Sequence, residues 1–176
     1  MANDSVGLDL NAYNATKKAV TEDASAGAGA FESVTTWSDG AIGVTRARSF
    51  ELRTDEPEAL GGRDSAIDPM ELLLGALGSC LTIGWATHAQ KHGVTLRSLE
   101  IRVRAPFDLR GYLGVDASVR PGFTELQYEV SVDSDADQAT LEAIRSAAEA
   151  GSPVFDNIAN GTATTGTVKP TVEDSP

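Results

Sequence analysis

The sequence predicts an α+β protein with a mainly antiparallel sheet and one long apolar helix. Residues 99–104 and 126–133 alternate apolar and polar side chains, which is the pattern of half-buried strands. Residues 69–92 form one continuous segment that is apolar almost all round, as in a buried helix. The expected elements do not alternate as βαβ units, and no glycine-rich dinucleotide motif is seen, which disfavours a parallel nucleotide-binding sheet.

Length and composition indicate a single soluble domain. The chain has 176 residues and a net charge of −12, and so acidic a surface disfavours nucleic acid and membrane partners. One cysteine, Cys80, and two histidines exclude an internal disulfide framework and a cysteine-cluster metal site, and no metal is predicted. The single cysteine, with no secretory signal visible at residues 1–6, favours a cytoplasmic protein.

The first third of the chain is expected to be a tail followed by strands. Residues 1–30 are predicted to be an N-terminal tail and linker with a short helix over 10–20, and residues 31–176 to be the folded domain. A strand over 31–37, a turn at Asp39-Gly40 and a strand over 42–52 make a hairpin. Residues 55–68 contain Pro57 and two adjacent glycines and are expected to form a loop.

Residues 69–92 carry clear signals for both ends of a helix. Asp68 is expected to cap it, Pro69 suits the first position, and Glu71 completes a capping box. Gly93 follows the last basic turn and can end the helix. The apolar run at 72–86 covers about 15 residues, short of the roughly 20 that a bilayer requires. It therefore predicts a helix in a core or at a subunit interface.

The second half of the chain is expected to hold strands and shorter helices. In order, these are a strand over 99–104, a long loop over 106–123, a strand over 126–132, a helix from Asp137 to near Gly151, a short turn or helix from Ser152-Pro153 to Asn160-Gly161, and a closing strand over 162–172.

Cys80 lies about twelve residues into the long helix, and it has two possible roles. Free cysteines are often buried as small apolar side chains, so simple packing is one interpretation. A reactive thiolate would need a nearby cation, because the dipole of its own helix fades within a turn. Gly75, Gly78 and Gly84 on the same helix favour close approach of a second copy of that helix, and hence a dimer.

Three segments resemble the OsmC/Ohr family, named for osmotically inducible protein C and organic hydroperoxide resistance protein. They are residues 55–80 (DEPEALGGRDSAIDPMELLLGALGSC), Arg120–Phe123 and Ser152–Asp156. The resemblance covers roughly residues 35–170. It implies an OsmC-like fold, an intertwined homodimer with sites at the subunit interface, and thiol-dependent reduction of organic hydroperoxides. In the family a reactive cysteine attacks the peroxide, a second cysteine resolves the product as a disulfide, and an arginine and a glutamate activate the thiolate.

The family's site residues match this chain only in part. Cys80 matches the reactive cysteine, but Ser152 occupies the position of the resolving cysteine. Met70 occupies the position of the glutamate. The adjacent Glu71 points to the side of an ideal helix opposite Cys80, so it is expected to cap the helix rather than activate the thiol.

The family's arginine has no direct match either. A near-ungapped comparison puts Ser38 at its position, and Arg46 or Arg48 on the predicted second strand are the candidates to replace it. Each is also compatible with an ordinary surface role on a strand.

The sequence is compatible with three different functions. The leading hypothesis is a single-cysteine OsmC-like peroxidase for oxidative stress defence, in which Cys80 reduces a small apolar organic hydroperoxide or related electrophile. An external thiol would reduce the sulfenic acid, and no metal or organic cofactor is implied. The alternatives are a non-catalytic dimeric protein that binds a small ligand, with Cys80 as packing, and a single-cysteine redox sensor.

Overall fold

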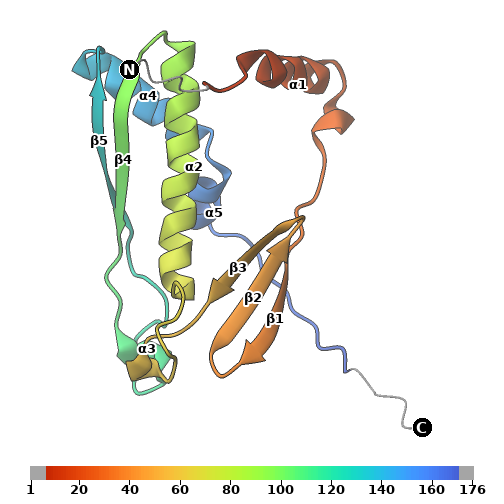
Figure 1. Ribbon diagram of the computed structural model, residues 1–176, viewed down its shortest axis with the longest axis vertical. Coiled ribbons are helices and arrows are strands. Elements are labelled where there is room, and N and C mark those ends of the chain that lie inside the picture. Colours follow the sequence, from red (N-terminus) through yellow and green to blue (C-terminus); the bar gives the residue numbers. More distant parts are fainter. Residues whose placement is uncertain (1–6, 171–176) are drawn as a thin grey trace.

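The computed structural model describes residues 7–170 and confirms the α+β class (Figure 1). Its elements are α1 (Leu10–Glu22), η1 (Ala24–Gly27), β1 (Val34–Asp39), β2 (Ile42–Ala47), β3 (Phe50–Thr54), η2 (Glu58–Leu60), α2 (Pro69–Lys91), β4 (Leu96–Arg104), α3 (Leu109–Tyr112), β5 (Gln127–Ser134), α4 (Gln138–Ala150) and α5 (Pro153–Asn160).

Two separate antiparallel sheets flank the long helix α2. One has the strand order β1-β2-β3, and the other consists of β4 and β5. Helix α2 runs beside β4 and also packs on α4 and α5, whereas the three-stranded sheet splays away from the foot of α2 (Figure 1). The strands of that sheet make their main contacts with one another. One chain therefore has its core around α2, β4–β5 and α4, with the other sheet projecting from it.

The core forms where α2 and α4 meet the inner face of the β4–β5 sheet. Trp85 and Ala89 of α2 and Ile144 and Ala148 of α4 are buried together. The alternating residues of β4 and β5 supply the half-buried side chains packed against this cluster: Leu96, Leu99, Ile101, Val130 and Val132. The period-two pattern of the sequence thus correctly identified the face of each strand that points inward.

The predicted ends of α2 are confirmed. The Asp68 carboxylate accepts the backbone N–H groups of Met70 and Glu71, and the Glu71 carboxylate accepts the N–H of Asp68 at 3.2 Å. Gly93 follows the helix with a φ of 69°. At 23 residues, α2 is long and apolar enough to cross a membrane by length and composition. Helices in the cores of soluble proteins share these properties, and one face of α2 packs on β4, α4 and α5.

The loop before α2 is organised around a buried carboxylate. Asp55 is only 1% exposed and accepts hydrogen bonds from the backbone N–H groups of Glu56, Arg63 and Ser65 and from the Ser65 hydroxyl. The chain folds back so tightly that a Cβ at Gly62 would lie 1.8 Å from the carbonyl oxygen of Glu56, so only glycine fits there. The loop is tied to the start of α2, because the Asp55 N–H donates to the carbonyl oxygen of Ile67 at 3.3 Å, next to the N-cap Asp68.

The prediction of one strand over residues 42–52 is wrong. The segment forms two strands, β2 and β3, joined by a tight turn at Arg48 and Ser49. Arg48 adopts a φ of 55° in this turn. Two-residue hairpin turns favour glycine, asparagine or aspartate at positions of positive φ, and none is present at 48–49. The sequence therefore carries no signal that would divide the run.

The predicted closing strand over 162–172 is also not confirmed. Residues 162–170 form no strand, and they extend away from the body of the chain (Figure 1); residues 171 and 172 lie outside the described residues. β-Branched side chains favour a strand only where a neighbouring strand offers backbone partners and a surface to pack on. No strand in the described part of the chain pairs with this segment.

The glycines of α2 mostly serve packing within the chain. A Cβ at Gly84 would lie 3.1 Å from the Cβ of Ala148 on α4, and one at Gly78 would lie 3.5 Å from Val103 on β4. Only Gly75 faces open space. The expectation that all three glycines face a second copy of the helix is therefore wrong for Gly78 and Gly84, because α4 and β4 already occupy those sides.

The predicted N-terminal helix is present as α1, and none of its residues is buried. It touches the body of the chain at the end of α2. The Gln90 side chain donates to the carbonyl oxygen of Leu8 at 3.1 Å, and the Lys91 ammonium lies 4.0 Å from the centre of the Tyr13 ring. The expected linker contains the short helix η1.

Candidate functional site

The structure brings together Cys80 and Ser152, which are 72 positions apart in the sequence. Cys80 is half-buried in the middle of α2. Ser152 is the N-cap of α5 and is 4% exposed. Its hydroxyl donates a hydrogen bond to the Cys80 sulfur at 3.1 Å and accepts the backbone N–H of Phe155 at 3.2 Å. The position matching the family's resolving cysteine is thus in direct contact with the thiol.

An apolar cavity of about 540 Å³ lies along the groove between α2 and α5. Met70, Leu73 and Leu77 line its α2 side. Cys80 continues this series at helical spacing, so all four residues share one face of α2. On the α5 side the cavity is lined by Phe155, whose N–H is bonded to Ser152. Cys80 and Ser152 do not themselves line the cavity, but Leu77 and Phe155, which do, each lie three residues along the chain from one of the pair.

The remaining walls of this cavity come from the segment that leads into β5. They are Arg120, Gly122, Phe123, Thr124, Glu125, Leu126 and Tyr128, with Ile158 and Ala159 of α5 completing the lining. Met70, at the position of the family's glutamate, makes this end of the cavity apolar, whereas Arg120 and Glu125 contribute one charge of each sign. The volume suits a small organic molecule with a large apolar part.

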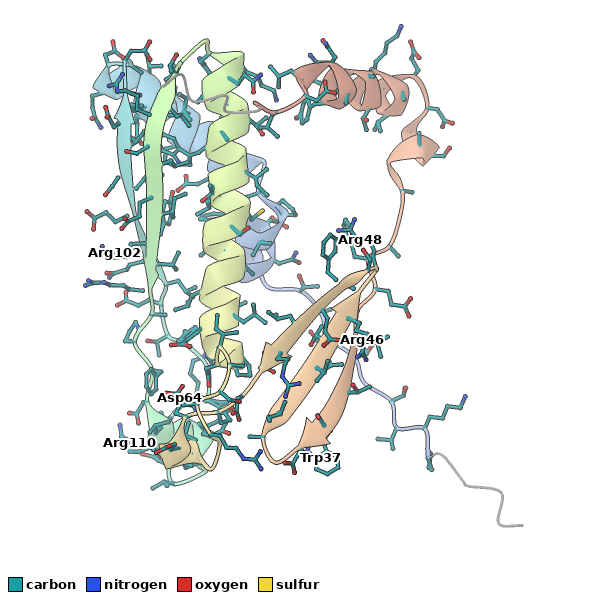
Figure 2. All side chains as sticks on the ribbon, in the orientation of Figure 1. Trp37, Arg46, Arg48, Asp64, Arg102 and Arg110 are labelled. Carbon is teal, nitrogen blue, oxygen red and sulfur yellow. The ribbon has the colours of Figure 1, made fainter. Side chains whose placement is uncertain are left out.

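Glu71 and the two candidate arginines are not brought to Cys80 within this chain. Glu71 is engaged in the capping box of α2, as the sequence predicted. Arg46 pairs with Glu51 at 2.6 Å, and the Arg48 guanidinium lies 5.0 Å from the Phe50 ring centre. Figure 2 shows both arginines on the three-stranded sheet, away from the middle of α2. Within one chain, neither arginine takes the place of the family's activating arginine.

A second, smaller cavity of about 310 Å³ lies between β5 and α4 and shares Tyr128 with the first. Its ionisable groups are bonded to one another, whereas the buried indole N–H of Trp85, which also lines it, has no hydrogen-bond partner among the described residues. The Tyr128 hydroxyl donates to Glu149, and Arg145 bridges Glu149 and Glu142. Burial raises the pKa of Tyr128, and the hydrogen bond to Glu149 acts in the same direction, so the phenol keeps its proton. This network engages the ionisable groups of the cavity and leaves the Trp85 indole N–H and the Gln138 amide outside it.

Sequence reasoning missed two features of the site. Arg120 belongs to one of the segments that carry the family resemblance, but no role was assigned to it, and it lines the larger cavity. The hydrogen bond from Ser152 to Cys80 was also not expected. Its only sequence signal is the Ser152-Pro153 pair, which is typical of a helix N-cap followed by the first helical position.

Comparison with solved structures shows which fold this is. An OsmC-like protein from Mycoplasma pneumoniae is 12% identical, with a TM-score of 0.65 over 74% of this chain and 88% of that chain. A putative osmotic stress induced and detoxification response protein from Psychrobacter arcticus is 19% identical, with a TM-score of 0.60 over 74% and 89%. An organic hydroperoxide resistance protein OsmC from Legionella pneumophila is 17% identical, with a TM-score of 0.53 over 74% and 89%. At these identities the likeness concerns the fold.

A family model gives the assignment at the level of sequence. No curated protein matches the chain. The model described as OsmC-like protein matches residues 62–166, more than half of the sequence, and this range contains α2 with Cys80 and the start of α5 with Ser152. The family match, the fold and the resemblance of the motifs agree: the chain belongs to the OsmC-like protein family.

Proposed function

We propose that this protein is a single-cysteine OsmC-like peroxidase that reduces organic hydroperoxides or related electrophiles at Cys80. The observation that carries the proposal is the half-buried Cys80 thiol, bonded by Ser152, about one helical turn from Leu77 in the wall of an apolar cavity of about 540 Å³. The organic hydroperoxide resistance proteins among the structures of the same fold support this substrate class. An apolar cavity favours an organic peroxide over hydrogen peroxide, because the organic group gains burial.

The chemistry uses one sulfur atom and needs two equivalents of external thiol. The Cys80 thiolate attacks an oxygen of the peroxide, the O–O bond breaks, and an alcohol leaves with a proton taken from solvent. Sulfur is oxidised by two electrons to sulfenic acid. A first thiol displaces water to form a mixed disulfide, and a second thiol releases Cys80 and the thiol's own disulfide. The chain holds no second cysteine, so the reductant must come from outside.

We propose further that the active form is a homodimer. The side of α2 that faces away from β4 and α4 is exposed, and Ile83 there is 59% exposed. The small residues Gly75 and Ser79 lie on the same exposed stripe, which favours close packing of a second α2. The second copy would then supply Arg46 or Arg48 as the cation that a single chain does not place near Cys80.

Sedimentation at micromolar concentration tests the dimer. We expect a dimer for the wild-type protein and a monomer for Ile83→Glu, because the dimer would bury two glutamates with no partner in the described structure. Ser131→Glu on the exposed outer face of β5 is the matched control and should remain dimeric. A monomeric wild-type protein would contradict the proposal.

Peroxide consumption with excess dithiothreitol tests the reaction. The wild-type protein should consume cumene hydroperoxide through many turnovers, and Cys80→Ser should reduce the rate to that of the uncatalysed mixture, because serine is a far weaker nucleophile at neutral pH. A protein that reacts once per Cys80 without turnover would be a sensor. One that binds an apolar ligand in the cavity but consumes no peroxide would be a binding protein, and either result would overturn the peroxidase.

A further inference from the structure

The Ser152 hydroxyl occupies a position that directs its single proton at the Cys80 sulfur. Its oxygen accepts the backbone N–H of Phe155 at 3.2 Å, and the sulfur lies 3.1 Å away as an acceptor. A serine hydroxyl has one proton to donate. With Ser152 only 4% exposed, water has little access to compete for that proton. The hydroxyl is therefore held in one arrangement, between a helix amide and a thiol.

We propose that Ser152 is a positioning residue that stabilises the Cys80 thiolate. A hydrogen bond to the charged form of a group favours that form, and hydrogen bonds to ionised acceptors are about twice as strong as neutral ones. The inference concerns the state of the thiol, and its relevance to peroxide reduction rests on the proposed function. Serine at this position cannot form a disulfide with Cys80, but it donates a hydrogen bond to the sulfur instead.

The positive end of a helix also reaches Cys80, but this helix is α5 and not α2. Cys80 lies about three turns into its own helix, beyond the range of its N-terminal dipole. Ser152 is the N-cap of the eight-residue helix α5, so the N-terminal end of α5 lies beside the sulfur. The Phe155 N–H polarises the serine hydroxyl, and hydrogen bonds linked in this way strengthen one another. The effect of the α5 dipole is thus transmitted through one side chain.

Other ionisable groups on the surrounding elements do not replace this contact. Glu149 of α4 is bonded to Arg145 and Tyr128. Asp156 in the first turn of α5 is exposed. His88 lies two turns beyond Cys80 on α2, and burial lowers its pKa, so it is largely neutral near pH 7. Within residues 7–170, Ser152 is the polar side chain that is hydrogen-bonded to Cys80.

The pH profile of Cys80 alkylation by iodoacetamide tests the inference without any peroxide. In Ser152→Ala the profile should move to higher pH by roughly one to two units, because the thiolate loses its donor. Ser152→Thr retains both the hydroxyl donor and a helix cap, so its profile should stay within a few tenths of a unit of wild type. Asp137→Ala is the matched control: it removes the N-cap of α4, which accepts the N–H of Thr140 at 2.8 Å, and should leave the profile unchanged.

An unchanged profile in Ser152→Ala would overturn the inference, as would a shift of equal size in Asp137→Ala. A Ser152→Thr variant that is folded by circular dichroism but behaves like Ser152→Ala would also contradict it. These outcomes are distinguishable from failure of the proposed function. If the profile shifts as expected but the wild-type protein consumes no peroxide, the Ser152 contact is upheld and the peroxidase is not.

Discussion

Replacing Ser152 with cysteine should convert the protein into one that forms an internal disulfide with one equivalent of organic hydroperoxide. The Ser152 Oγ atom lies 3.1 Å from the Cys80 sulfur, so a thiol built there needs only a small movement to reach the S–S distance of about 2.05 Å. Sulfenic acid at Cys80 would then condense with the new thiol, releasing water. In the wild-type protein the sulfenic acid has no thiol of its own chain to react with.

Mass spectrometry after peroxide treatment distinguishes the two proteins. Wild type should give a dimedone adduct, the mark of a lasting sulfenic acid, whereas Ser152→Cys should give no adduct and lose two hydrogens in mass. Ser131→Cys is the control, because its thiol lies on the exposed outer face of β5. That control should keep its dimedone adduct. If Ser152→Cys also keeps the adduct, or forms only disulfides between molecules, the contact between positions 80 and 152 is wrong.

Replacing the buried Asp55 with asparagine should destabilise the protein more than any exposed substitution in the same loop. Asp55 accepts four hydrogen bonds, from three backbone N–H groups and the Ser65 hydroxyl. Asparagine has the same shape, but only one of its two terminal groups is an oxygen. Its NH₂ group would face N–H or O–H donors that now bind a carboxylate oxygen. At pH 7 we expect Asp55→Asn to lower the Tm by roughly 5–10 °C. Because Asp55 is hydrogen-bonded to Ile67, next to the N-cap of α2, the cavity wall at Met70 should also be disturbed.

The pH dependence of stability provides a second test of Asp55. The hydrogen bond from the Ser65 hydroxyl, with those from the backbone, holds the pKa of Asp55 below its usual range. The folded state therefore binds fewer protons there than the unfolded state. The ionised Asp55 carboxylate therefore stabilises the folded protein at any pH above about 4, the ordinary pKa of aspartate. This stabilisation is lost as the pH falls from there through the lower pKa that Asp55 has in the folded protein. Wild type should lose this contribution in acid, and Asp55→Asn should not.

Asp64 supplies the control for this experiment. It is exposed in the same loop (Figure 2) and adopts a φ of 51°, which asparagine tolerates well. Asp64→Asn should leave both the Tm and its acid dependence almost unchanged. Glu56 works in the opposite sense, since burial and repulsion from Asp68 raise its pKa. Equal acid dependence in wild type and Asp55→Asn would show that Asp55 is not the group that titrates.

The sequence predicted those elements whose signals are local. The ends of α2 follow from Asp68, Glu71 and Gly93, and Asp137 caps α4 as expected. Ser152-Pro153 opens α5, where a short turn or helix was predicted. The features that the sequence did not predict depend on contacts with residues distant in the chain, or on a residue with an unusual backbone conformation. The turn at Arg48 lacks a typical turn residue, and Gly84 faces α4 because α4 returns to pack beside α2. Small residues permit close approach but do not specify which partner approaches.

The candidate site was predictable only through the family resemblance. From composition alone, Cys80 could be either a packing residue or a reactive thiol. Only the family resemblance linked it to Ser152, the position of the family's resolving cysteine. The cavity could not be predicted, because it joins Met70 of α2, Arg120 of a loop and Phe155 of α5, which only the tertiary fold brings together. Arg46 and Arg48 illustrate the reverse case. They were candidates from their strand positions, but their sheet projects from the body of the single chain.

The rate at which Cys80 is oxidised tests most directly whether it is a nucleophile toward organic hydroperoxides. Loss of the free thiol can be followed by quenched alkylation after mixing with cumene hydroperoxide or hydrogen peroxide, with Cys80→Ser as the blank. We expect the organic peroxide to react at least about tenfold faster, because the apolar cavity that begins about one turn from Cys80, at Leu77, can bind its organic group. Rates that are equal for the two peroxides, and no greater than that of a free thiol in solution, would contradict it.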